Sequence, residues 1–221
     1  RNTKAEELVI LSQESIFTDS KETDQTTFEA ILKDQKFRTV NTQKNSLKEI
    51  ESKLEELSIG TLIIPISKDF KISIFRSYIN FSNKNNIPIL FSRGTSPINN
   101  IGFLSSNDFS ENSPTTISFD IASTLNAKVY GVVVDQPKFL SHENTESKNS
   151  VIQKLQDAAL SNEVQLEVLS DEGNEAKIFT SFTDKFDLSI IGHNQSTSWQ
   201  LKKTTEFITQ NSSSSVLYMP I

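Results

Sequence analysis

The chain contains no cysteine, so disulfide bonds, thiol nucleophiles and thiolate metal sites are all excluded. Histidine is almost as scarce, with His142 and His193 alone among 221 residues, which argues against a metal centre built from several histidines. No Walker-type phosphate loop, Ser/His/Asp order or paired-carboxylate spacing occurs along the chain. The sequence therefore shows no recognisable catalytic constellation and no metal-binding cluster.

Long apolar runs and an excess of positive charge are also missing. No apolar stretch approaches the ~20 residues that cross a bilayer, and we expect no signal peptide. The 28 acidic residues outnumber the 22 basic ones and give a net charge of −6, which disfavours nucleic acid and anionic membranes as partners. We therefore expect a cytoplasmic protein without direct membrane insertion. Because the chain opens with Arg1 and not with methionine, we also expect a fragment or a processed form.

What the second half does contain is a regular alternation of strand and helix patterns. Short apolar segments are separated by longer segments whose apolar residues recur at helical spacing. This alternation predicts a parallel sheet with helices on both faces. The strands are expected at residues 101–105, 129–134, 164–169, 188–191 and 216–221. The helices are expected at 201–210 and along the stripes Ile117/Ile121/Leu125, Val151/Leu155/Ala159 and Phe179/Phe182/Phe186.

The first half follows the same pattern less regularly. Gly94 and Pro97, within the segment 93–100, indicate a linker. We therefore divide the chain into two domains, residues 1–96 and 97–221. The strands of the first domain are expected at residues 7–12, 37–40, 61–66 and 87–91, and its helices at 26–33, 46–57 and 72–83.

Four segments of the second half, taken in their order and spacing, resemble the universal stress protein family. They are Asp108–Ser113 after the first strand, Leu125–Val134 at a helix-to-strand join, Glu172-Gly173 after the third strand, and Phe186–Gly192 running into a glycine. The final helix and strand also fit, so the resemblance covers residues 101–221. It implies a flavodoxin-like fold, of the adenine nucleotide alpha hydrolase type, with the strand order 3-2-1-4-5.

The first half resembles the same family more faintly, and two elements of the family pattern have no counterpart in it. If residues 57–66 and 79–93 match the later family segments, Leu8–Ser12 is the second strand, and the first strand and helix are absent. Because the first strand lies between the second and fourth, its loss leaves a gap with unpaired backbone groups. We favour a tandem protein whose first segment precedes Arg1. A rewired half, or a four-stranded sheet with Leu8–Ser12 as central strand, are the alternatives.

Nucleotide-binding members of the family carry a glycine-rich segment after the fourth strand. It reads glycine, two residues, glycine, about nine residues, and then glycine with serine or threonine. Glycine lets backbone amides approach the phosphates, and the following helix N-terminus favours the anion. Here Gly192 remains, but Gln195 replaces the second glycine, and Lys202 and Lys203 stand near the final pair. We therefore predict that ATP is not bound in the family mode and that no cofactor is present.

The alternative is that an adenine nucleotide is bound through the positive charge of this region. The two lysines and hydroxyls such as Thr204 would then hold a phosphate at a helix start, although a solvated helix turn is the simpler interpretation. Asp108 follows the first strand at the edge where open α/β sheets bind ligands, although a helix-capping role is again simpler. The candidate ligand-binding residues are Asp108, Gly192, Gln195, Lys202, Lys203 and Thr204.

The resemblance implies a non-enzymatic stress-response or regulatory protein, bacterial and cytoplasmic. One alternative is a ligand- or nucleotide-sensing cytosolic domain of a larger protein such as a transporter, and a weaker one is a hydrolase on a related fold. Family members commonly dimerise through their last strands. We therefore expect residues 87–91 and 216–221 to pair within one chain, as an intramolecular pseudo-dimer that covers both sheet edges. The sequence does not decide whether two copies of the chain also form a homodimer.

Overall fold

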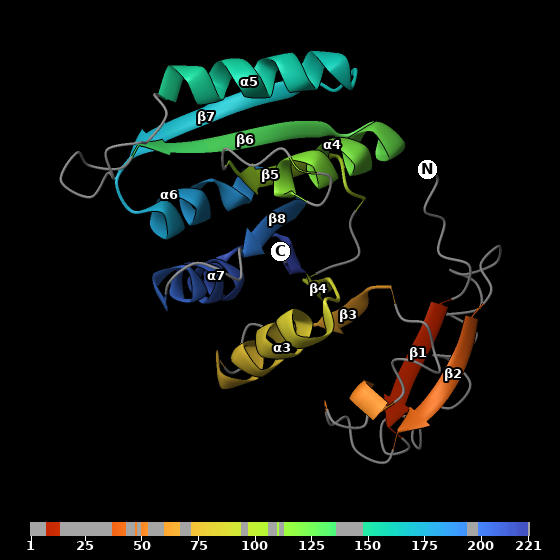
Figure 1. The fold of residues 1–221 in the computed structure, drawn as a ribbon. Coiled ribbons are helices and arrows are strands. Elements are labelled where there is room, and N and C mark those ends of the chain that lie inside the picture. The colour runs from red at the N-terminus through yellow and green to blue at the C-terminus, as the bar shows by residue number, and fades with distance from the viewer. Residues whose placement is uncertain are drawn as a thin grey trace. The chain divides into compact units, whose positions relative to one another are not determined.

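The computed structural model divides the chain into two compact units, residues 1–59 and 60–221, each described by itself (Figure 1). The described residues are 8–13, 37–42, 47, 50–52, 60–66, 72–93, 97–105, 110, 113–135, 148–193 and 199–220. Within these residues, no helix combines the length and apolar character that a membrane crossing requires.

The first unit contains a parallel pair of strands, β1 (Leu8–Gln13) and β2 (Phe37–Thr42). Both strands confirm the sequence prediction. Among the described strands they pair only with each other, so they form a two-stranded sheet and not the four-stranded sheet considered as an alternative. The helix predicted at residues 26–33 lies outside the described residues, and of the helix predicted at 46–57 the described residues 47 and 50–52 are helical.

The second unit is built on a seven-stranded sheet in the order β3-β4-β9-β8-β5-β6-β7. All neighbours are parallel except β4 and β9. The strands are β3 (Leu62–Pro65), β4 (Ile89–Ser92), β5 (Asn100–Leu104), β6 (Lys128–Asp135), β7 (Leu166–Glu172), β8 (Leu188–His193) and β9 (Ser215–Pro220). From β7 to β9 this order is 3-2-1-4-5 when the strands of the second half are numbered along the chain, as predicted.

The helices connect successive parallel strands. They are α3 (Ile72–Asn85), α4 (Pro114–Leu125), α5 (Lys148–Ser161), α6 (Glu175–Phe182) with the 3₁₀ turn η1 (Thr183–Lys185), and α7 (Trp199–Asn211). The Ser113 side chain caps the start of α4, where Pro114 occupies the first turn, and Asn126 ends the helix in the left-handed conformation with φ 53°. The phenylalanine stripe needs a correction, because α6 ends at Phe182 and Phe186 lies beyond η1.

The sheet has a packed core on each face. Phe119 of α4 and Leu155 of α5 share one apolar cluster with the strands, and Met219 of β9 points into it. The preceding residue, Tyr218, is buried on the opposite face, because successive strand residues alternate. There its hydroxyl donates to Asn83 Oδ1 of α3 at 2.6 Å. Helices α4 and α5 therefore cover one face, and α3 covers the other.

The single antiparallel contact joins the two halves of the sequence. In it Ile89 lies opposite Tyr218, and Phe91 lies opposite Val216. The predicted pairing of residues 87–91 with 216–221 is confirmed by this register. All four of these side chains are fully buried, so the join is part of the core and not a surface contact. The division at residues 96 and 97 remains a prediction about the repeats, since β3 and β4 belong to the same sheet as the second half.

Candidate functional site

The candidate site lies where the chain reverses its direction of winding through the sheet. From β5 the chain passes through α4 to β6 on one side, and from β8 it passes through α7 to β9 on the other side. β5 and β8 are parallel neighbours, so the chain leaves both strands at the same edge. Open α/β sheets bind ligands in the crevice at the carboxyl ends of such a strand pair. We call this edge, beyond Leu104 and His193, the switch-point edge.

Two buried hydroxyls mark the switch-point edge. Ser105 follows β5 directly, and its backbone N–H continues the ladder by donating to Val132 O at 2.9 Å. Its side-chain Oγ is buried and has no hydrogen-bond partner among the described residues. Thr115, in the first turn of α4, is fully buried, and its Oγ1 also lacks a partner within the part of the chain that the structure describes. An unpartnered buried hydroxyl is costly, so each is a potential contact for a polar group that enters this edge.

The neighbouring hydroxyls of α4 are all engaged. Ser113 Oγ accepts from the backbone N–H of Thr116 at 3.2 Å and contacts Thr116 Oγ1 at 3.1 Å. Ser118 donates to the carbonyl of Pro114 at 2.6 Å. Thr115 therefore differs from the other hydroxyl residues of the same helix start, which satisfy the backbone locally. Sequence reasoning missed Ser105 and Thr115, and the one available signal was their position at a strand end and in a first helical turn.

The structure describes only part of the predicted site. Gly192 lies in β8 opposite Met219 and is half-buried, and Thr204 is half-buried in α7. The backbones of Lys202 and Lys203 are in the first half of α7, which begins at Trp199, but their side chains lie outside the description. Asp108 and Gln195 lie outside the described residues. The strand–helix framework thus brings Gly192 to the switch-point edge.

The described ionisable groups with displaced pKa values belong to other places. At the amino end of β6, Lys128 Nζ lies 2.6 Å from Glu167 Oε2, a contact that raises the pKa of Lys128 and lowers that of Glu167. Burial lowers the pKa of Arg93 at the end of β4 and raises that of Tyr218 in β9. Among the described residues, no three His, Cys, Asp or Glu side chains are grouped to hold a metal ion.

Solved structures share this fold across nearly the whole chain. A universal stress protein from Archaeoglobus fulgidus matches 97% of this chain and 85% of its own, with a TM-score of 0.63 at 11% sequence identity. A protein of unknown function from Pseudomonas aeruginosa matches 96% of this chain and 81% of its own, with a TM-score of 0.64 at 15% identity. The predicted likeness in fold to universal stress proteins is confirmed. No protein-family model matches the sequence. No curated protein matches it either.

Proposed function

We propose that this chain is a universal-stress-type regulatory protein that acts in the cytoplasm by binding and not by catalysis. The fold shared with the Archaeoglobus universal stress protein supports the class. The lack of catalysis is supported by the chemistry of the described residues at the switch-point edge. They are hydroxyls and a glycine, without a described pair of acid and base groups beside them.

We further propose that a triphosphate is not held there through the loop backbone. The carrying observation is the replacement of the second glycine of the family segment by Gln195, with Lys202 and Lys203 near its end. A side chain at that position obstructs the approach of a phosphate to the peptide nitrogens. The lysine ammonium groups would supply positive charge in place of the peptide nitrogens. Each is a single contact on a flexible side chain and does not form a rigid phosphate-binding loop.

Calorimetry with magnesium and ATP tests the non-nucleotide assignment. We expect no micromolar binding by the natural chain. We also expect the triple variant Gln195→Gly, Lys202→Gly, Lys203→Ser to gain affinity, because it restores the bare backbone. Gln153→Gly, on the exposed surface of α5, is the matched control for an added glycine. Micromolar ATP binding by the natural chain would overturn the assignment.

A second candidate function is a small-ligand sensor within a larger protein. The observation that favours it is the pair of buried hydroxyls, Ser105 Oγ and Thr115 Oγ1, which lack partners at the edge where this fold class binds ligands. Native mass spectrometry of the freshly purified chain tests it. A bound small molecule that is retained by the natural chain and lost from Thr115→Val supports a sensor. Spectra that show only the ligand-free mass of each protein contradict it.

The antiparallel join of β4 and β9 supports an intramolecular pseudo-dimer, in which each half covers the sheet edge of the other. On this proposal the protein needs no second copy at that edge. Sedimentation equilibrium should therefore give one 24.8-kDa mass at micromolar concentrations. A homodimer that dissociates on mutation of Ile89 or Tyr218 would show that this edge is shared between chains instead.

A further inference from the structure

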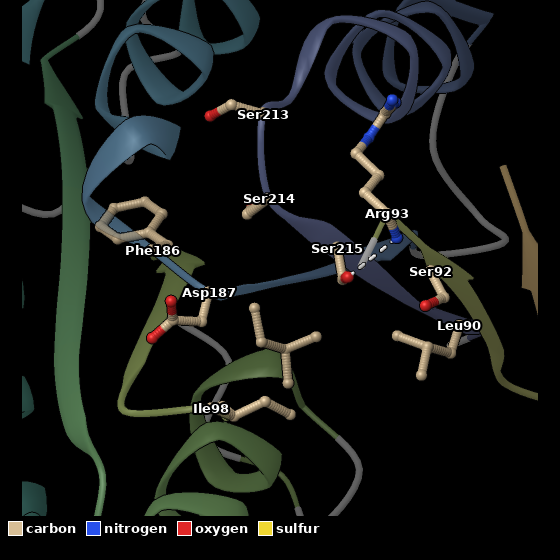
Figure 2. A pocket seen from close by; sticks show the side chains of 10 residues that line it. Leu90, Ser92, Arg93, Ile98, Phe186, Asp187, Ser213, Ser214 and Ser215 are labelled. Atoms are coloured by element: carbon tan, nitrogen blue, oxygen red, sulfur yellow. Dashed lines mark hydrogen bonds between the residues drawn. The ribbon is translucent and has the colours of Figure 1, made fainter. Parts of the chain in front are cut away.

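A cavity of about 210 Å³ opens at the edge of the sheet opposite to the switch-point edge (Figure 2). It lies where β4 ends and where β8 and β9 begin, with Ile98 from the approach to β5 beside it. Leu90 and Leu188 supply apolar walls, and Ser213, Ser214 and Ser215 form a row of hydroxyl residues along another wall. We call this cavity the seam pocket, because the join of β4 and β9 creates it.

The two charged residues of the seam pocket are already bound to the backbone. Asp187 Oδ2 accepts from the backbone N–H groups of Asn99 and Asn100, each at 2.9 Å. The guanidinium of Arg93 donates to the carbonyls of Thr209 and Gln210 at the end of α7. Figure 2 shows the side chain of Arg93 running toward that helix, away from the apolar walls. Arg93 Nε is buried without a hydrogen-bond partner among the described residues, so the guanidinium is only partly engaged. The pocket carries one charge of each sign, so Asp187 repels an anionic ligand and Arg93 repels a cationic one, which favours an uncharged ligand.

The serine row, in contrast, has hydrogen-bonding capacity left. Ser215 Oγ accepts from the backbone N–H of Arg93 at 3.1 Å and keeps its own proton for donation. Ser213 Oγ donates to Thr183 Oγ1 at 3.2 Å and keeps lone pairs for acceptance. One donor and one acceptor therefore remain beside the apolar walls. Ser214 Oγ is shared between Ser189 and Ser212 and is buried.

We propose that the seam pocket binds a small uncharged molecule with a compact apolar body and one hydroxyl or amide group. The apolar body lies against Leu90, Ile98 and Leu188, and its polar group exchanges hydrogen bonds with Ser213 and Ser215. The volume limits the size: an apolar cavity of about 150 Å³ holds benzene, so about 210 Å³ holds a six-membered ring with one polar substituent. This site is independent of the proposed function, because it lies at the other edge of the sheet.

The test uses three probes that share a ring and differ in the charge of the polar group: cyclohexanol, cyclohexanecarboxylate and cyclohexylammonium. Each is titrated into the full chain while amide chemical shifts are recorded by NMR. Cyclohexanol should shift the amides of residues 90–93 and 213–215 with millimolar affinity. Its affinity should exceed that of either charged probe at least tenfold. Tighter binding of a charged probe, or no saturable shift by cyclohexanol at these residues, overturns the proposal.

Two variants locate the binding within the seam pocket. Leu90→Phe adds volume to a wall and should weaken cyclohexanol at least tenfold. Its matched control is Ile63→Phe, because Ile63 lies opposite Leu90 in the parallel register but is 50% exposed and does not line the pocket. Ser215→Ala removes one hydroxyl and should weaken cyclohexanol about fivefold. The Ser215→Ala variant still tests the proposal if Leu90→Phe fails to fold. Unchanged affinity in Ser215→Ala contradicts the assigned contact.

Discussion

Arg76 of α3 and Glu206 of α7 form a two-pronged ion pair between helices that flank the join of β4 and β9. Arg76 Nε lies 2.8 Å from Glu206 Oε1, and Nη2 lies 2.9 Å from Oε2. The arginine side chain is 61% exposed, whereas the glutamate side chain is only 12% exposed. The contact raises the pKa of Arg76, chiefly through the hydrogen bond. The partner that depends on this pair is therefore the glutamate, whose carboxylate has little water around it.

Removal of either partner should accordingly have unequal effects. We expect Arg76→Ala to lower the melting temperature more than Glu206→Gln, because the first change leaves a nearly buried carboxylate without its counter-charge. Lys128→Ala is the control, since its pair with Glu167 has both side chains substantially exposed, and it should change the melting temperature least. Calorimetric melting of the three variants measures the order. Equal losses for Arg76→Ala and Lys128→Ala would show that burial of Glu206 has no energetic consequence.

The buried hydroxyl of Tyr218 predicts a stability change at alkaline pH. Burial raises its pKa from 10.0 to about 12. Because the folded pKa lies above the unfolded value, this residue's stabilisation is complete below pH 10 and is lost as the pH rises toward 12.

Tyr218→Phe should therefore cost ~1 kcal/mol near neutral pH through the lost hydrogen bond. The difference between the two proteins should then shrink, or change sign, between pH 10 and 12. Urea unfolding at pH 7, 9, 10, 11 and 12 provides the measurement. The pKa of Tyr78 is also raised by burial, but this residue is common to both proteins and cancels in the comparison. A difference that stays constant across this range would exclude Tyr218 as the source.

Gly102 in β5 provides the space that Phe186 occupies. A Cβ at this position would overlap Phe186 Cδ2 and Cε2, which no ordinary contact allows. The ring is buried and held by Phe179, at a centroid distance of 5.9 Å, so it cannot simply swing away. Gly102→Ala should destabilise the fold by about 1–3 kcal/mol in urea unfolding.

Gly131→Ala is the matched control for that substitution. It lies on the neighbouring strand, and its added Cβ would meet Phe103 Cζ at 3.2 Å, a milder approach. It should therefore cost less than Gly102→Ala. The double variant Gly102→Ala, Phe186→Leu should recover part of the lost stability, because leucine is smaller than phenylalanine and leaves room for the added Cβ. A double variant less stable than the sum of its single changes would contradict this account.

The hydroxyl of Thr115 is expected to reduce stability in the absence of a ligand. Its Oγ1 is buried without a partner, so Thr115→Val removes a desolvated polar group while keeping the side-chain shape. We expect the free energy of unfolding to stay equal or to rise by up to ~1 kcal/mol. Ser118→Ala, in the same helix, should instead lower it, because Ser118 donates to Pro114 O at 2.6 Å. Loss of stability in Thr115→Val comparable to that in Ser118→Ala would show that the hydroxyl is satisfied after all.

Local pattern was sufficient for the elements of the second half. The strand predicted at 129–134 is β6 with one residue more at each end, and the strand at 188–191 extends two residues to His193. The stripe Ile117/Ile121/Leu125 correctly predicted helix α4, which the structure shows capped by Ser113 and beginning at Pro114. These features depend on neighbours within a few residues, which is why the sequence reveals them. The 3₁₀ turn between Phe182 and Phe186 was not predicted, because residues in a 3₁₀ turn recur at nearly the same spacing as in an α-helix.

The candidate site was predicted less completely. Gly192 could be placed because it follows an apolar strand, and its edge of the sheet follows from the winding order. Ser105 and Thr115 could not be found in this way, because a serine after a strand and a threonine in a helix usually find local partners. Whether a hydroxyl is left without one depends on which groups are brought against it from elsewhere.

By itself the sequence determined the order and type of the elements, the lack of cysteine chemistry and the altered glycine segment, since each is a matter of residue identity or short-range spacing. Tertiary structure alone decided that Ile89 meets Tyr218 in antiparallel register, that β1 and β2 form a sheet of their own, and that a cavity lies beside Ser215. These contacts join residues that lie far apart along the chain, or they depend on what fills the space between elements. Their free energy comes from burial and pairing, which no local pattern encodes.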